Sequence, residues 1–213
     1  MKKPGICEWC LPKLPYVEEP RCMKCGKPIF DEEKEYCLDC AKHPLAYDQG
    51  KSVWIHKGTV PGAIYQFKFH NKRYQGAVFA EEMAERYGDW IRACNMETIV
   101  PVPLHPSKRR QRGFNQAEVL AKELGKRVNL PVETDVIFRV KKTLPQKKLG
   151  DKERIDNLKQ AFAVSKHWEP KKAVLVIDDI YTTGNTIHRI AKVLKLAGVE
   201  KVYFLTISIG QGL

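Results

Sequence analysis

Two adjacent carboxylates, Asp178 and Asp179, follow a continuous apolar run, and a stretch rich in threonine and glycine comes directly after them. The run is typical of a buried parallel strand, and open parallel sheets bind ligands beyond the C-terminal ends of their strands. The stretch offers hydroxyl groups, backbone N–H groups at the start of a following helix, and a glycine that permits close approach. We therefore expect the carboxylates to face a cation or a sugar diol, and a phosphate monoester to bind at Thr182, Thr183, Gly184, Asn185 and Thr186.

The acidic pair has two other interpretations. In a generic strand that ends in two aspartates, the pair more often only terminates the strand and caps a helix. The acidic residue of a P-loop ATPase is a further alternative, but it requires a Gly-x-x-x-x-Gly-Lys-Ser/Thr segment. The nearest fragment is Gly50-Lys51-Ser52, and Leu45 stands where the first glycine is needed. The ATPase interpretation therefore fails.

Basic residues gather in the middle of the chain. The net charge is +12, and residues 101–170 carry 16 basic and 8 acidic side chains. Such an excess indicates an anionic partner, either a polyphosphate or a nucleic acid. A run of this kind is usually a solvated face, but this one follows an expected strand at 98–104, where it would face the acidic pair. Its arginine forks suit bidentate phosphate contacts, and its members are Lys108, Arg109, Arg110 and Arg112.

Six of the seven cysteines form three Cys-x-x-Cys pairs within the first 40 residues, and Cys94 stands alone. Two pairs separated by 11 residues are typical of a tetrahedral four-cysteine zinc site. The 11-residue gap occurs twice, so three pairs compete for sites that need two each. The pairs are Cys7/Cys10, Cys22/Cys25 and Cys37/Cys40.

The remaining pattern predicts an α/β protein. Residues 1–45 are short of periodic apolar positions and would need a metal to fold. We interpret 1–45 as a zinc ribbon, 46–95 as a lead-in or hood segment, and 96–213 as the α/β core. Strands are expected at 52–57, 98–104, 135–140, 173–177 and 202–209, and helices at 75–91, 115–127 and 186–197. The alternation implies a parallel sheet covered by helices, and the polar stretch 143–159 is expected to be a mobile loop.

Residues 174–186 (VLVIDDIYTTGNT) resemble the phosphoribosyl-pyrophosphate (PRPP) signature of type I phosphoribosyltransferases. Residues 100–115 (VPVPLHPSKRRQRGFN) and the ribbon at 22–40 resemble segments of the ComF family of late-competence proteins. The spacing of Gln146, Leu149, Arg154, Asn157 and Ala161-Phe162 resembles a further pattern of that family. The resemblance covers nearly the whole chain. It implies a type I phosphoribosyltransferase fold, with a Rossmann-like parallel sheet and flanking helices, plus a small N-terminal zinc ribbon.

The resemblance also implies roles for individual residues. Asp178 and Asp179 would bond the ribose 2′- and 3′-hydroxyls, and residues 182–186 would enclose the 5′-phosphate. The basic run would bind pyrophosphate, and the loop at 143–159 would close over the reacting centre with Lys147, Lys148 and Arg154. The implied reaction displaces pyrophosphate from the anomeric carbon of Mg²⁺-bound PRPP. Positioning, Mg²⁺ and basic side chains would drive it without a nucleophilic Ser, Cys or His.

The cysteine pairing stays open between two main arrangements. ComF proteins commonly carry four Cys-x-x-Cys pairs, and the resemblance aligns the three pairs here with the second to fourth. A structural Zn²⁺ on Cys22, Cys25, Cys37 and Cys40 is preferred over one on Cys7, Cys10, Cys22 and Cys25, and an interleaved arrangement is a third alternative. One prediction is that the gene begins upstream and encodes another pair.

Two functions from different classes follow from these observations. The first is a PRPP-binding enzyme that transfers phosphoribosyl to an unidentified acceptor and takes part in DNA uptake during natural transformation. The second is a non-catalytic competence module that binds single-stranded DNA or a protein of the competence machinery, with PRPP as a regulatory ligand. The N-terminus has no apolar signal segment and the chain has no apolar run of membrane-spanning length, which favours a cytoplasmic location.

Overall fold

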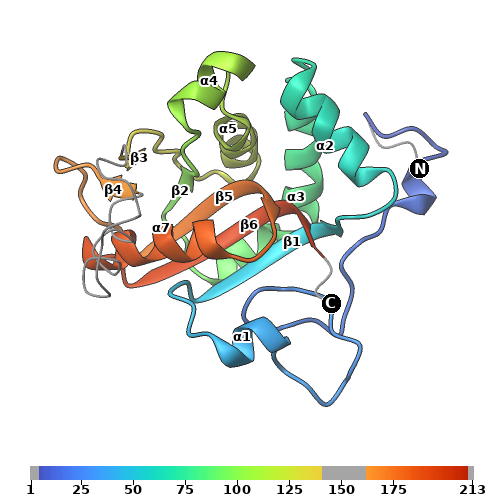
Figure 1. Ribbon diagram of the computed structural model, residues 1–213, viewed down its shortest axis with the longest axis horizontal. Helices are drawn as coiled ribbons and strands as arrows, with labels where there is room; N and C mark the ends of the chain where they lie inside the picture. Colours follow the sequence, from blue (N-terminus) through green and yellow to red (C-terminus); the bar gives the residue numbers. More distant parts are fainter. Residues whose placement is uncertain (1–4, 141–161, 211–213) are drawn as a thin grey trace, which may run out of the picture.

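The computed structural model describes residues 5–140 and 162–210. Its centre is a sheet of four parallel strands in the order β1-β6-β5-β2 (Figure 1). The strands span Gln49–Ile55 (β1), Lys201–Ile209 (β6), Ala173–Tyr181 (β5) and Thr98–Pro101 (β2). The two central strands are almost continuously buried, as their apolar sequences require.

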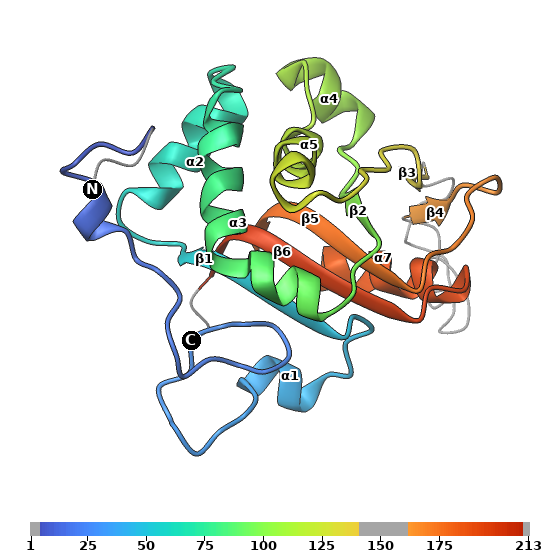
Figure 2. The same ribbon diagram turned by 180° about the vertical axis from the view of Figure 1, so that it is seen from behind.

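Alternate side chains of the central strands enter two separate hydrophobic layers. Val174 and Val176 point to one layer with the helix α7 (Asn185–Leu196), and Leu175 and Ile177 point to the other. The second layer is formed with α3 (Gln75–Ala93) and α5 (Gln116–Val128). Figures 1 and 2 show α7 on one face of the sheet, and α3 and α5 on the opposite face. The expected α/β architecture with a helix-covered parallel sheet is confirmed.

The described part of the N-terminal region contributes no strand of its own to the sheet, although Tyr16 forms an isolated antiparallel bridge with Trp54 of β1. It holds a short 3-10 helix at Leu11–Lys13 (η1) and the helix α1 (Leu38–Lys42), and loops connect them. The segment 46–95 contributes β1, which pairs with β6 in the central sheet, and it also contributes α2 (Val60–Phe69) and α3. Within the described ranges, no helix is long and apolar enough to cross a membrane.

Five of the described elements are not among the predicted ones: η1, α1, α2, α4 and β4 (Phe162–Val164). The helix α2 buries Val60, Ile64 and Phe67, whose spacing of four and then three residues is a helical signal. The helix α4 (Pro106–Arg112) contains the basic run, for which no helix is predicted from the sequence. Its proline lies in the first turn, and Gly113 ends it with φ 76°.

One expected strand is placed wrongly. The segment β3 (Ile137–Arg139) does not join the parallel sheet but pairs antiparallel with β4 (Phe162–Val164) in a sheet of its own. Only Ile137 of the three β3 residues is buried, so the segment lacks the apolar run that a central strand needs. The expected loop at 143–159 lies outside the described residues.

Candidate functional site

The acidic pair lies within β5, because this strand continues to Tyr181 and does not end at 177 as expected. Asp178 is in register with Thr206 of β6, and the backbone N–H of Asp179 donates to Asp178 Oδ1 at 2.8 Å. Burial, followed by the neighbouring charge of Asp179, raises the pKa of Asp178 to about 7, although Lys68 and Arg139 act in the opposite direction. The protein therefore holds a carboxyl group that titrates near neutral pH.

Lys68 is the direct partner of the acidic pair. Its Nζ lies 2.9 Å from Asp179 Oδ2, and the two side chains are only 17% and 14% exposed. Lys68 lies four residues after the buried Ile64 on α2, so the helix directs both side chains toward the sheet. The sequence-based reasoning missed this residue, and its place on the apolar face of a helix was the available signal.

Two further groups face the acidic pair and were also missed. His56 follows β1 and its Nδ1 lies 2.9 Å from Ser208 Oγ. Burial and the charge of Lys68 lower the pKa of His56, while Asp179 raises it. Arg139 of β3 lies close enough for its charge to lower the pKa of Asp178, and its Nε donates to the carbonyl of Pro103 at 3.2 Å.

The three residues between β5 and α7, named here the Thr-Gly loop, are Thr182, Thr183 and Gly184. Gly184 has φ 76°, and a Cβ there would overlap the hydroxyl of Tyr181, so glycine is required on two grounds. The helix then begins at Asn185, one residue before the expected start. The side chains of Thr182, Thr183 and Asn185 are exposed, and Thr186 is half-buried. The structure thus places the whole predicted phosphate-binding set two residues beyond the acidic pair and at the positive end of a helix.

The basic run forms α4, which follows β2 at the same end of the sheet. Lys108, Arg109 and Arg110 are exposed, and Arg109 lies 3.6 Å from Glu118. Arg112 is half-buried, and its guanidinium lies 4.6 Å from the ring centroid of Phe69, the residue after Lys68. Arg112 therefore brings α4 into contact with the end of α2. The predicted pyrophosphate residues Lys147 and Lys148, and the predicted catalytic residue Arg154, lie outside the described residues.

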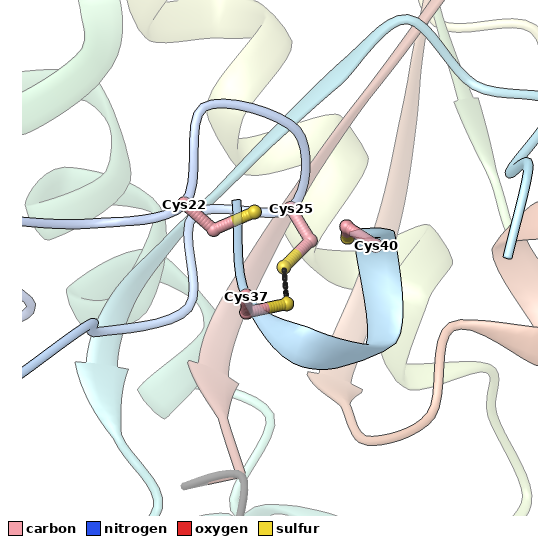
Figure 3. Close-up of side chains that lie close together, drawn as sticks. All are labelled: Cys22, Cys25, Cys37 and Cys40. Carbon is pink, nitrogen blue, oxygen red and sulfur yellow. Dashed lines mark hydrogen bonds between the residues drawn. The ribbon is translucent and has the colours of Figure 1, made fainter. Parts of the chain in front are cut away.

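Four cysteines converge in the N-terminal region (Figure 3). Cys22 and Cys25 lie in a tight turn, in which Gly26 N donates to the carbonyl of Cys22 at 2.9 Å. The other two cysteines lie at the start of α1, where Cys37 is the N-cap and Cys40 lies in the helix. The sulfur atoms of Cys22, Cys25, Cys37 and Cys40 all lie within 4.8 Å of one another.

The chemistry of this four-thiol cluster fits zinc. Four sulfur donors at tetrahedral spacing are the usual ligand set of a structural Zn²⁺. The hydrogen bond to Cys22, together with burial, raises the pKa of Cys25 and of Cys40, and the same bonds lower the pKa of Cys22, so Cys25 and Cys40 donate to the Cys22 sulfur when no cation is bound. Cys7 and Cys10 form a turn of their own and are not members of the cluster. The cluster therefore combines the second and third cysteine pairs, which is the preferred arrangement from the sequence.

The fold, the acidic pair and the four-thiol cluster define an α/β protein with an N-terminal zinc ribbon, and the sequence comparisons agree. The double zinc ribbon domain family matches residues 1–41. Competence protein F of Haemophilus influenzae is 32% identical over 205 residues, which cover 94% of this chain and 88% of that protein.

Two other relatives cover a similar share. DNA utilization protein YhgH of Escherichia coli K12 is 26% identical over 93% of this chain and 87% of its own length. Competence protein ComFC of Streptococcus pneumoniae is 26% identical over 92% of this chain and 84% of its own length. The chain belongs to the ComF family of competence proteins.

Solved structures of phosphoribosyltransferases are also similar to this chain. A glutamine PRPP amidotransferase from Bacillus subtilis aligns over 63% of this chain and 25% of its own, with 16% identity and a TM-score of 0.42. A purine phosphoribosyltransferase from Pyrococcus horikoshii aligns over 62% of this chain and 73% of its own, with 14% identity and a TM-score of 0.40.

Proposed function

We propose that this protein binds PRPP with Mg²⁺ at the acidic pair and the Thr-Gly loop. One observation carries the proposal: the two carboxylates lie near the C-terminal end of a central parallel strand, and only two residues separate them from an exposed loop and a helix N-terminus. A sugar phosphate is complementary to this arrangement, because its diol can donate hydrogen bonds to the carboxylates and its phosphate can accept them from the loop and the helix N-terminus. Asp178 and Asp179 accept from the ribose hydroxyls, and residues 182–186 donate to the 5′-phosphate.

The charge state of the pair gives this binding a pH dependence. Burial and the charge of Asp179 raise the pKa of Asp178 to about 7. When Asp178 is protonated, one of its oxygens becomes an O–H donor and the group is a weaker acceptor for a sugar hydroxyl. The affinity for PRPP therefore increases as the pH rises through 7. Lys68 orients the second carboxylate through the 2.9 Å contact to Oδ2, so the other oxygen is left to face the ligand.

The reaction that fits this donor is phosphoribosyl transfer. The bond between the anomeric carbon and pyrophosphate breaks, the electron pair leaves with pyrophosphate, and a nucleophilic acceptor forms the new bond and loses its proton. Mg²⁺ carried by the ligand would neutralise charge on the leaving group. Basic side chains of α4, together with Lys147, Lys148 and Arg154, are the proposed partners of pyrophosphate. The relatives named for competence and for DNA utilization favour a role in DNA uptake.

Calorimetric titration with Mg²⁺-PRPP tests the binding proposal. The wild type is expected to bind, and the double variant Asp178→Asn/Asp179→Asn is expected to lose at least a hundredfold in affinity, because two charge-assisted contacts are removed. Equal affinity in the double variant would sink the assignment. Release of pyrophosphate in the presence of candidate acceptors then separates an enzyme from a PRPP-binding regulator.

A second function is favoured by a separate surface feature. Exposed aromatic side chains gather around the end of α2 and the start of α3, and they alternate with basic residues. The rings of Tyr65 and Phe69 are 4.9 Å apart. Stacking surfaces beside cationic groups suit single-stranded nucleic acid, and the members of this surface are Tyr65, Phe69, Tyr74, His70, Arg73 and Arg112.

DNA binding at this surface is tested with a single-stranded oligonucleotide and a salt series. The affinity should fall steeply with salt, and the variant Tyr65→Ala/Tyr74→Ala should bind several-fold more weakly, at an unchanged salt slope. Binding that is absent, or that ignores both salt and the two tyrosines, would remove this function.

A further inference from the structure

A pair of buried tyrosines joins two regions that are far apart in the sequence. The hydroxyl oxygens of Tyr47 and Tyr181 lie 2.7 Å apart. Tyr47 is fully buried and Tyr181 is 3% exposed. Burial raises the pKa of both phenols, so both hydroxyls stay protonated through neutral pH and one donates to the other.

One end of this link supports the Thr-Gly loop. Tyr181 is the last residue of β5, and its hydroxyl lies so close to Gly184 that a Cβ at this position would overlap it. The left-handed backbone of Gly184 therefore rests directly on the phenol oxygen. The hydrogen bond with Tyr47 holds the Tyr181 hydroxyl in place, and this hydroxyl in turn holds Gly184 of the loop. Without that hydrogen bond, the hydroxyl and the loop are both freer to move.

The other end of the link lies beneath the four-thiol cluster. Tyr47 shares a hydrophobic cluster with Cys22 and Cys25. The turn between these cysteines docks at the start of β1, where Gly50 N donates to the carbonyl of Lys24 at 2.8 Å. The Lys24 ammonium also lies 5.5 Å from the centroid of the Tyr47 ring. The shape of the zinc-binding turn thus determines how Cys22, Lys24 and Cys25 pack over Tyr47.

Two further contacts run in parallel with the hydroxyl pair. The ring of Phe204 stacks on Tyr181 with a centroid distance of 4.7 Å and meets Tyr47 edge-on at 4.8 Å. Ala46 N donates to Nδ1 of His188, which lies in the first turns of α7, at 3.0 Å. Burial lowers the pKa of His188, so its ring is neutral and can accept this bond. The segment after the ribbon is therefore bonded both to the last residue of β5, which precedes the loop, and to the helix that follows the loop.

We infer that the zinc ribbon positions the Thr-Gly loop through Tyr47, so that metal loading of the ribbon sets the affinity of the loop for a phosphorylated ligand. Tyr47 is a positioning residue, because it acts through Tyr181 and does not touch the ligand. The ligand half of this inference rests on the proposed function, and the mechanical half does not. The four-thiol cluster can hold its turn only with a cation between the sulfurs, and this turn is what covers Tyr47.

Hydrogen exchange of the full-length, zinc-loaded protein tests the mechanical half without any ligand. Tyr47→Phe keeps the ring and removes one hydroxyl, and faster exchange is expected in residues 182–188. Removal of zinc with a chelator should accelerate the same residues in the wild type. Tyr87→Phe is the matched control, because its buried hydroxyl donates to Ser52 O at 2.8 Å and lies on α3. Unchanged exchange in the loop after both treatments, or an equal change in Tyr87→Phe, would overturn the inference.

Calorimetry with Mg²⁺-PRPP tests the ligand half. Tyr47→Phe and Tyr181→Phe should each weaken binding about fivefold, which is the loss expected for one hydrogen bond. The double variant should be no weaker than either single variant, because both remove the same bond. Additive losses would contradict a shared link. If the wild type does not bind PRPP, the proposed function fails, and the exchange experiment still decides the coupling.

Discussion

The four-thiol cluster and the acidic pair both bring like-charged groups together, but they solve the electrostatic problem differently. In the cluster, the nearby ammonium of Lys27 is held by Asp39 at 2.7 Å, so the sulfurs require an external cation. At the acidic pair, Lys68 contacts Asp179 directly and supplies the positive charge from within the chain. The comparison indicates a structural metal site in the first case and supports the proposed binding of a neutral diol in the second.

The largest expected effect concerns the cluster. Cys25→Ser should abolish stoichiometric zinc and lower the Tm by roughly 10 °C or more, because the ribbon has little apolar core of its own. Metal analysis and calorimetric unfolding measure both quantities. Cys94→Ser and Cys7→Ser serve as controls and should keep their zinc. Loss of zinc in Cys7→Ser would contradict the pairing described here and favour the first two cysteine pairs.

The next effect concerns the internal cation. Lys68→Met leaves Asp179 without its partner in a largely buried position, so the free energy of unfolding at pH 8 should fall by about 2 kcal/mol. Urea denaturation measures the change. Lys122→Met is the control, because it removes the exposed 2.7 Å pair with Glu118 and should cost about 0.5 kcal/mol or less. Equal losses in the two variants would mean that Lys68 is an ordinary surface lysine.

A smaller effect of opposite sign is expected at Asp178. Its raised pKa means that the folded state binds the proton more tightly than the unfolded state, so stability is lost as the pH rises from about 4 through 7. Asp178→Asn removes this loss and should stabilise the protein by about 1–2 kcal/mol at pH 8. The gain should disappear near pH 4. A variant that is less stable than the wild type at pH 8 would contradict the burial of this charge.

The smallest effect on stability is expected in α4. The variant Lys108→Gln/Arg109→Gln/Arg110→Gln should change the free energy of unfolding by less than about 0.5 kcal/mol, because these side chains are exposed. Its affinity for inorganic pyrophosphate should nevertheless fall several-fold. If pyrophosphate binding is unchanged, this surface has no part in the site.

The two clusters also differ in how far the sequence predicts them. All four thiols lie within 19 consecutive residues, so their spacing indicates a metal site, but the same 11-residue gap occurs twice and the preferred pairing rests on the family resemblance. The carboxylates and the Thr-Gly loop are likewise contiguous and were predicted. Lys68, His56 and Arg139 come from three separate segments, and only the folded sheet brings them to Asp178 and Asp179.

The errors in the predicted fold have a similar cause. The strand β5 continues past Ile177 because Asp178 and Ile180 pair with Thr206 and Ser208 of β6, and this register is not visible in β5 alone. The short segment at β3 alternates like a strand, but its partner is the equally short β4 and not the central sheet. Local patterns identified the helices α3, α5 and α7, which bury long apolar stripes.

The acidic pair is proposed to bind a sugar diol while the Thr-Gly loop binds its phosphate. Calorimetric titration of the wild type with ribose 5-phosphate and with 2-deoxyribose 5-phosphate tests this directly, because the two ligands differ by one hydroxyl. The deoxy sugar should bind at least tenfold more weakly, since a buried carboxylate is left without its donor. Equal affinities for the two sugars would contradict the account.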